Sequence, residues 1–453
     1  MSTVQRDRPP APGQIRPLVF PAIERRRLDN DLAVLAARHG DLPLVTAMLV
    51  VDAGAAGDPA RKAGLARLTT DALETGTRTR SADQIAWELE HLGIELQATA
   101  TWDAAILSIT APRERLEAAL ELFADIVRHP AFPEAEVDRL RDEQLATILQ
   151  NRKEPRALAN DMAAHFIFAE GVPYGRPLIG TTASVQALTR DDVEAFYRTH
   201  YLPNASSLLF VGHIDADTAR DLADRHFGDW PAGQPTTPEF EVVPGVETRT
   251  VFIVDRPGSV QSEIRIGDIG VARHHEDYFP LLVMNTILGG AFTSRLNMSL
   301  RERHGFTYGA RSGFAFRKRP GPFIVQAAVA TDVTARAVEE ALKEMTALRE
   351  EGASEQEVAA ARDYLRGILP LQLQTTEQLA SRLADIVIFD LPDDYFQQYR
   401  QRIADVSPDD VHRVAREHLR LDRLAIVVVG DAERIAPGLE SLDVGTVVIH
   451  QDY

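Results

Sequence analysis

The stretch Leu188-Thr-Arg-Asp-Asp-Val193 decides the fold of this chain, because it occurs twice. Val406-Ser-Pro-Asp-Asp-Val411 repeats it 218 residues later. Each copy is followed by an apolar stretch that ends in glycine, at Gly212 and at Gly430, which are again 218 residues apart. Similarity at one fixed distance indicates a duplicated structural unit, and any functional site has to lie on that unit.

Other segments recur at a similar spacing and predict the same elements in both halves. The corresponding pairs are a strand at 42–51 and 261–268, alternating strands at 95–109 and 308–329, an amphipathic helix at 114–128 and 336–350, and a charged helix at 134–150 and 354–366. Strands therefore come in consecutive pairs that are separated by long helical stretches. This pattern favours an α+β fold with two homologous domains, each a mostly antiparallel or mixed sheet covered by helices.

The turn-rich segment 228–238 lies where the first copy ends, so we place the domain boundary there. We expect an N-terminal extended arm over 1–30, an α+β domain over 31–232 and a second α+β domain over 233–453. The arm contains several arginines and prolines but no apolar stretch of the kind found in signal peptides.

Composition excludes several classes of protein. The chain has 453 residues and no cysteine, which excludes disulfide scaffolds, thiol enzymes and iron–sulfur proteins. Its net charge of −18 argues against a general nucleic-acid binder, because an acidic surface repels phosphate. No apolar run reaches the ~18 residues that a membrane-spanning helix needs. We therefore expect a soluble, cytoplasmic protein with no nucleic-acid or membrane partner.

Three segments give the chain a resemblance to a known family. They are Gly64-Leu-Ala-Arg-Leu-Thr-Thr-Asp-Ala-Leu-Glu-Thr-Gly-Thr77, Leu288-Gly-Gly-Ala-Phe-Thr-Ser-Arg-Leu296 and Leu300-Arg-Glu-Arg-His-Gly-Phe-Thr-Tyr308. With the duplicated unit of about 220 residues, they resemble the pitrilysin or insulinase family of inverted-zincin metallopeptidases. The likeness is strongest to two-domain bacterial members and to the mitochondrial processing peptidase subunits.

The first of these segments departs from the family at the metal site. Active members carry H-x-x-E-H on a helix, in which two histidines bind zinc and the glutamate activates water. Arg67, Thr70 and Asp71 stand at those positions here. The resemblance therefore implies a degenerate site without zinc, and Arg67 and Asp71 are expected to form an ion pair one helical turn apart.

The family's third zinc ligand, a glutamate, aligns near Ala146 or Thr147, and Glu143, about one helical turn away, is the nearest acid. The cluster His274-His275-Glu276 places two adjacent histidines beside an acid. It precedes an apolar run, so we expect it to begin a helix rather than to bind metal. The chain is thus expected to have no cofactor of its own.

The second and third segments keep the family pattern. The resemblance implies that Arg301 and Tyr308 face the zinc site across a cleft and donate hydrogen bonds to the oxygen of the peptide carbonyl under attack, where negative charge develops. It also implies that Gly289 and Gly290 contact substrate, although glycines here can equally make a tight turn. Thr293 or Ser294 is expected to cap a helix that ends at Gly305, with a strand over 306–316.

Two hypotheses follow. In the first, the chain is the metal-free subunit of a heterodimeric zinc metallopeptidase: a paralogous partner carries H-x-x-E-H and the zinc, and this chain adds Arg301 and Tyr308 to act on peptides. In the second, it is a non-catalytic scaffold or peptide-binding subunit like the core proteins of respiratory complexes. A self-sufficient hydrolase is disfavoured, because the sequence has neither a G-x-S-x-G nucleophile elbow nor a phosphate-binding loop.

Overall fold

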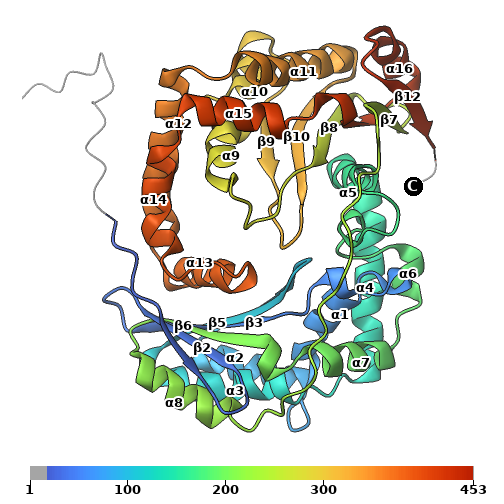
Figure 1. Ribbon diagram of the computed structural model, residues 1–453. Helices are drawn as coiled ribbons and strands as arrows, with labels where there is room; N and C mark the ends of the chain where they lie inside the picture. The colour runs from blue at the N-terminus through green and yellow to red at the C-terminus, as the bar shows by residue number, and fades with distance from the viewer. Residues whose placement is uncertain (1–17, 452–453) are drawn as a thin grey trace, which may run out of the picture.

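The computed structural model describes residues 18–451 and contains two six-stranded sheets with helices around them (Figure 1). Both sheets are mixed, so the α+β prediction is confirmed. Of the predicted arm, residues 1–17 lie outside the described part, and Glu24–Arg27 forms strand β1 at the edge of the first sheet. Within the described residues, no helix combines the length and the apolar character needed to cross a membrane.

The first sheet has the strand order β1-β2-β6-β3-β5-β4. Its other strands are β2 (Ala33–Arg38), β3 (Leu44–Val51), β4 (Leu96–Ala100), β5 (Ala105–Pro112) and β6 (Ser206–Gly212). The helices of this half are α1 (Leu65–Ala72), α2 (Ala82–Leu92), α3 (Leu116–Arg128), α4 (Glu134–Lys153), α5 (Pro155–Ile167), α6 (Thr182–Gln186), α7 (Arg190–His200) and α8 (Ala216–Phe227).

The second sheet has the order β12-β7-β11-β8-β10-β9, which reproduces the first except at the outermost strand. Its strands are β7 (Thr250–Asp255), β8 (Gln261–Ile269), β9 (Ala310–Phe314), β10 (Pro322–Ala330), β11 (Ala425–Gly430) and β12 (Thr446–His450). The helices are α9 (Tyr278–Asn285), α10 (Arg295–Asn297), α11 (Thr334–Glu351), α12 (Glu355–Ile368), α13 (Thr376–Ile388), α14 (Tyr395–Asp405), α15 (Pro408–His418) and α16 (Ala432–Ser441).

The repeated motif begins equivalent helices, α7 and α15, with a capping box. The Thr189 hydroxyl accepts a hydrogen bond from the Asp192 backbone nitrogen, and the Asp192 side chain accepts one in return. Ser407 and Asp410 do the same at the start of α15. Because a capping box satisfies two backbone donors that the first turn leaves unpaired, the motif fixes where each helix begins and so where the next strand can start.

One helix of each half packs on the sheet of the other half. Helix α5 of the first half packs on β8 and β11, and helix α13 of the second half packs on β3 and β6 (Figure 1). The two helices occupy the same place in the repeat. One apolar cluster joins Leu158 and Phe166 of α5 to Val254 and Val427 of the second sheet.

Strand β3 shows how the first sheet is buried on both faces. Successive side chains of a strand point to opposite faces. Ala47 and Leu49 belong to the core under the outer helices, whereas Met48 and Val50 belong to the core that includes α13. At the α13 crossing, the Thr46 hydroxyl donates a hydrogen bond to the Thr376 hydroxyl over 2.7 Å. Both faces therefore need apolar side chains, which explains the nearly continuous apolar run of this strand.

Because α13 covers the first sheet, its buried side chains should stabilise both halves together. We expect Leu383→Ala to lower the free energy of unfolding by about 2–5 kcal/mol, since Leu383 is fully buried in the core shared with β3 and β6. Urea denaturation followed by far-UV circular dichroism measures this loss. Ser381→Ala, at an exposed position of the same helix, is the control and should change the value by less than about 0.5 kcal/mol. Equal effects of the two substitutions would contradict this role of α13.

Candidate functional site

The segment interpreted from the sequence as a degenerate zinc motif contributes Arg67 and Asp71 to a cavity of about 620 Å³ between the two halves. Helix α1 contributes Arg67 and Asp71, α4 contributes Glu143 and Thr147, and the β9–β10 hairpin of the second half closes the other side. Among the described residues that line this cavity there is no histidine. The groove is thus formed by both halves of the repeat.

The side chains of Arg67, Thr70 and Asp71 on α1 already have hydrogen-bond partners within the chain. Arg67 Nε donates to Asp71 Oδ2 over 2.6 Å, which is the ion pair expected from the sequence. Thr70 is fully buried. Its hydroxyl donates to the Ala66 carbonyl and lies 3.0 Å from the hydroxyl of Tyr201. Thr70 therefore faces the core of the first half and is not among the residues that line the groove.

Helix α4 offers little to a metal at this place. Thr147 lines the cavity, but its hydroxyl donates to the Glu143 carbonyl within the same helix, and Glu143 pairs with Arg139. Ala146, the other predicted position, does not line the cavity. Gln144 is buried and its amide donates to the Gly64 and Ile179 carbonyls, so it holds the start of α1 against the chain that follows α5.

The groove disfavours isolated negative charge. Burial raises the pKa of the Asp71 carboxyl, and the neighbouring Arg67 opposes this rise. Burial also raises the pKa of Asp161, on α5 at the same cavity, to about 6. A carboxylate in this place therefore depends on a nearby cation to stay ionised.

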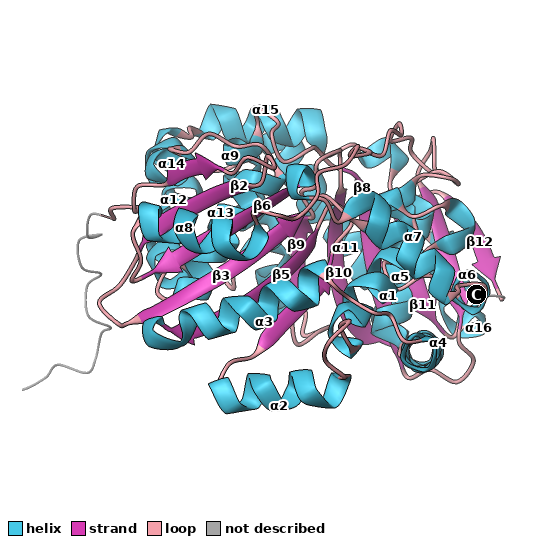
Figure 2. Cartoon of the chain, turned by 90° about the horizontal axis from the view of Figure 1, so that it is seen from below, coloured by secondary structure: helices cyan, strands magenta, loops and turns pink. Residues whose placement is uncertain are grey.

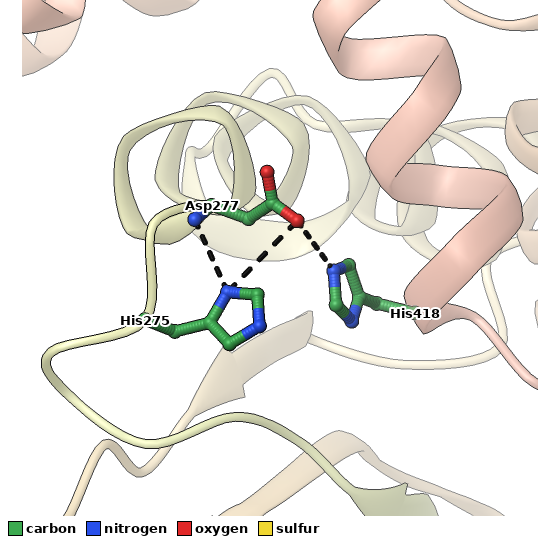
Figure 3. Close-up of side chains that lie close together, drawn as sticks. All are labelled: His275, Asp277 and His418. Atoms are coloured by element: carbon green, nitrogen blue, oxygen red, sulfur yellow. Dashed lines mark hydrogen bonds and ion pairs between the residues drawn. The ribbon is translucent and has the colours of Figure 1, made fainter.

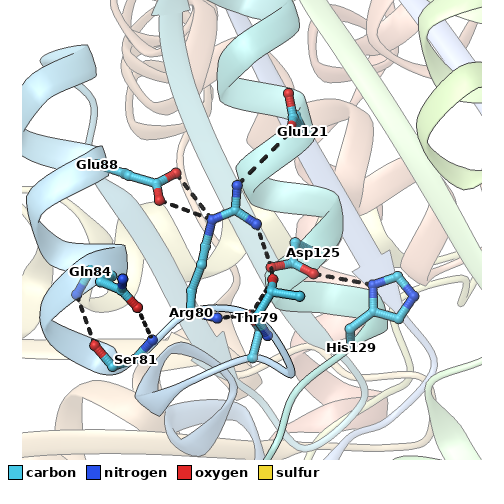
Figure 4. A network of polar contacts seen from close by, with 9 residues as sticks. Thr79, Arg80, Ser81, Gln84, Glu88, Glu121, Asp125 and His129 are labelled. Atoms are coloured by element: carbon cyan, nitrogen blue, oxygen red, sulfur yellow. Dashed lines mark hydrogen bonds and ion pairs between the residues drawn. The ribbon is translucent and has the colours of Figure 1, made fainter.

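The segment after α1 is held in place by a polar network around Arg80 (Figure 4). Its guanidinium donates to Glu88 of α2 over 3.0 Å and to Asp125 of α3 over 2.7 Å. Ser81 and Gln84 form a capping box at the start of α2. The network ties α2, which lies at the margin of the first half (Figure 2), to α3.

In the second half, Arg301 and Tyr308 lie on either side of a sharp chain reversal. Arg301 is in a π-helical turn over Met298–Arg303, and its guanidinium lies 4.6 Å from the centre of the Phe292 ring. The reversal is at Gly305, whose φ of +65° is left-handed, as predicted, and Phe306 donates back to the Leu300 carbonyl. Ser294 occupies the N-cap position of α10 but makes no capping hydrogen bond.

Tyr308 precedes β9 and is 97% exposed. The strand expected over 306–316 begins only at Ala310. Tyr308 lines a second, smaller cavity on the face of the second sheet, which does not include Arg67 or Asp71. Arg301 does not line either cavity.

The two glycines at the turn differ. Gly289 is buried, and a Cβ there would come within 2.3 Å of the Ser312 backbone nitrogen on β9, so packing alone requires glycine. Gly290 is exposed. Contact of either glycine with substrate stays a prediction.

One group of side chains has the composition of a metal site (Figure 3). His275 and Asp277 precede α9, where the sequence predicted a helix start, and His418 ends α15. Their ligand atoms lie within 4.8 Å of one another. His275 and His418 are distant in the chain, so no local sequence pattern could predict that they lie together.

These side chains already satisfy one another without a metal. Asp277 Oδ2 accepts from His418 Nε2 over 2.9 Å, its other oxygen accepts from Arg413, and the Asp277 backbone nitrogen donates to His275 Nδ1. A guanidinium on the same carboxylate disfavours a second cation. The cluster therefore clamps the start of α9 to α15.

Comparison with known proteins gives one consistent result. Residues 34–182 match the family model for insulinase (peptidase family M16), and residues 187–365 match the model for the peptidase M16 inactive domain. An uncharacterized zinc protease of Streptomyces coelicolor is 29% identical over 77% of this chain and 76% of its own length. A probable mitochondrial-processing peptidase subunit beta of Schizosaccharomyces pombe is 25% identical over 91% of this chain and 92% of its own length.

Solved structures share the fold. A peptidase M16 inactive domain from Pseudomonas fluorescens superposes with a TM-score of 0.84 at 23% identity, covering 90% of this chain and 98% of the other. A protease from Helicobacter pylori gives a TM-score of 0.85 at 19% identity, covering 90% and 100%.

The groove residues do not fit the zinc ion that the names of the relatives imply. Zinc sites in proteins use histidine, cysteine and carboxylate ligands. Here Arg67 places a cation where the first ligand is expected, and it already holds the only carboxylate of α1 that lines the groove. We therefore derive no step through a metal on this chain.

The contacts of Asp277 with Arg413 and His418 predict a pH-dependent contribution to the stability of the second half. Burial opposes ionisation of Asp277, but hydrogen bonds from Arg413 and His418 outweigh it and hold the pKa of this carboxyl at about 2. The unfolded value is about 3.9, so the stabilisation is complete above about pH 4 and is lost as the pH falls towards 2. We expect Asp277→Asn to cost about 1.5–3 kcal/mol at pH 7 and almost nothing near pH 2.

Chemical denaturation of both proteins over this pH range measures the difference. Glu276→Gln removes the neighbouring, exposed carboxylate and serves as the control. A cost for Asp277→Asn that does not change with pH would contradict the ionised clamp.

Proposed function

Since the chain belongs to peptidase family M16, the insulinase family, we propose that it is the non-zinc-binding subunit of a heterodimeric metallopeptidase that degrades peptides. A paralogous partner with an H-x-x-E-H motif would hold the zinc, which supplies the activated water. This chain would complete the site with Arg301 and Tyr308. The observation that carries the proposal is the self-satisfied Arg67–Asp71 pair at the place of the metal ligands.

The position of Tyr308 supports a role towards another chain. Its side chain is almost fully exposed, and it lines a different cavity from Arg67 and Asp71. A phenol buried against its own chain would be spent on internal hydrogen bonds. An exposed phenol next to a cavity can instead donate to a peptide that is held between two subunits.

The proposed chemistry of the pair is stabilisation of developing charge. When water adds to a peptide carbonyl, negative charge grows on the oxygen, and a guanidinium and a phenol can both donate to it. Arg301 now stacks on the exposed Phe292 and lies 3.6 Å from Glu302. These contacts are partly exposed and weak, so the guanidinium can turn towards a bound peptide at little cost.

The first test is reconstitution. We expect no peptide cleavage by this chain alone, no cleavage or little by the partner alone, and chelator-sensitive cleavage when the two are mixed. The zinc of the complex should disappear when the partner's motif is mutated and should remain after Asp71→Ala in this chain. Chelator-sensitive turnover by this chain alone would contradict the division of labour.

The second test is substitution of the donors in the mixed enzyme. Arg301→Ala and Tyr308→Phe should each lower kcat by about 10²–10³, as loss of one oxyanion donor does elsewhere. Arg303→Ala and Tyr364→Phe are matched controls, since both side chains are at least partly exposed and lie in the same half. Unchanged turnover with normal assembly would remove the donor role and favour the scaffold hypothesis.

A further inference from the structure

The cavity beside Tyr308 has a volume of about 310 Å³ and lies on three neighbouring strands of the second sheet. Arg311 on β9, Gln326 on β10 and Arg265 on β8 are direct partners in the strand register, so they form one row across the sheet. Arg156, in the first turn of α5, lines the same cavity from the other half of the chain. Figure 1 shows α5 beside β8.

The guanidinium of Arg265 is used in hydrogen bonds within the protein. It is only 1% exposed, and its guanidinium donates to Glu263, to Asn160 and to the carbonyls of Ile264 and Arg156. Among the described residues that line the cavity, Glu263 is the only acid, and its charge is neutralised by this contact. Arg265 and Glu263 therefore set the shape of the cavity and add no net charge to it.

The guanidinium groups of Arg156 and Arg311 are not used in this way. Both are exposed, and within residues 18–451 neither guanidinium has a hydrogen-bond or ion-pair partner. Two uncompensated positive charges therefore meet at one cavity that also presents the Tyr308 phenol and the amides of Gln261 and Gln326.

We propose that this cavity binds a carboxylate of the peptide substrate, either an acidic side chain or the C-terminal carboxylate. A guanidinium presents paired donors that match the two oxygens of a carboxylate, and the phenol and the amides can donate to the same group. The inference rests on the proposed peptide substrate. Because Tyr308 lines this cavity, the recognised carboxylate lies close to the bond that is cleaved.

The charge at the cavity is positive, whereas the net charge of the whole protein is negative. A net charge of −18 attracts cationic peptides at long range. At the cavity, however, two arginines within a few ångströms of the ligand outweigh distant charges, which salt screens beyond about 10 Å. The expected substrate is therefore a peptide with a carboxylate at one defined position rather than a generally basic peptide.

Peptide binding to the isolated, full-length chain tests the site without any turnover. The probes are fluorescent peptides of one sequence with Glu or Gln at a central position, each with a free or an amidated C-terminus, and anisotropy gives their Kd. We expect a carboxylate at one of the two places to tighten binding roughly ten- to a hundredfold. The four peptides show which of the two carboxylates is used.

Variants identify the cavity. Arg156→Gln and Arg311→Gln should each remove most of the preference and leave the affinity of the uncharged peptide unchanged, while Arg311→Lys should keep part of it. Arg61→Gln, an exposed arginine of the first half outside the cavity, is the control and should keep the full preference. Thermal unfolding verifies that each variant is folded.

Equal binding of all four peptides, or a preference that survives the combined Arg156→Gln and Arg311→Gln substitutions, would overturn the proposal. The outcome is separate from that of the reconstitution, because a carboxylate preference can be present in a chain that contributes nothing to catalysis. Conversely, loss of turnover in Arg301→Ala together with equal binding of the four peptides would support the catalytic role and reject the carboxylate site.

Discussion

The exchange of α5 and α13 between the two halves is the constraint on which the rest of the structure depends. Each sheet would expose an apolar face if it had only the helices of its own half. Helix α5 covers that face on the second sheet and α13 covers it on the first. The halves therefore cannot separate without exposing both faces, and at roughly 25 cal/mol per Å² of apolar surface such exposure is costly. The duplicated units form one cooperative body.

The same exchange explains why the cavity at Arg67 and Asp71 and the cavity at Tyr308 lie so close together. Asn160 of α5 lines the groove that contains Arg67 and also accepts a hydrogen bond from Arg265 at the Tyr308 cavity. Arg156, one helical turn earlier, reaches that cavity directly. A helix of the first half thus forms the wall between the groove and the cavity, and it supplies polar side chains to both.

Local sequence patterns predicted the helices and strands but not which of them pack together. The apolar run at 42–51 and the amphipathic pattern at 114–128 depend on residues a few positions apart, and β3 and α3 lie there. An apolar helix face, by contrast, does not say which sheet it will cover, so the exchange of α5 and α13 could not be predicted. The row from Arg265 to Arg311 requires the strand register, and the Asp277–His418 contact joins residues that are 141 positions apart.

The candidate groove could be predicted only in part, for a similar reason. The ion pair between Arg67 and Asp71 follows from helical spacing, whereas the contact of Thr70 with Tyr201 depends on how α1 packs on α7. Together these contacts explain how the family fold persists without the ligands. Where a metal holds a fold, its binding energy is part of the folding energy. Here the burial that raises the pKa of Asp71 is opposed by Arg67, a cation of the same helix, and Thr70 completes its hydrogen bonds inside the core. Helix α1 therefore needs no ion to stay folded.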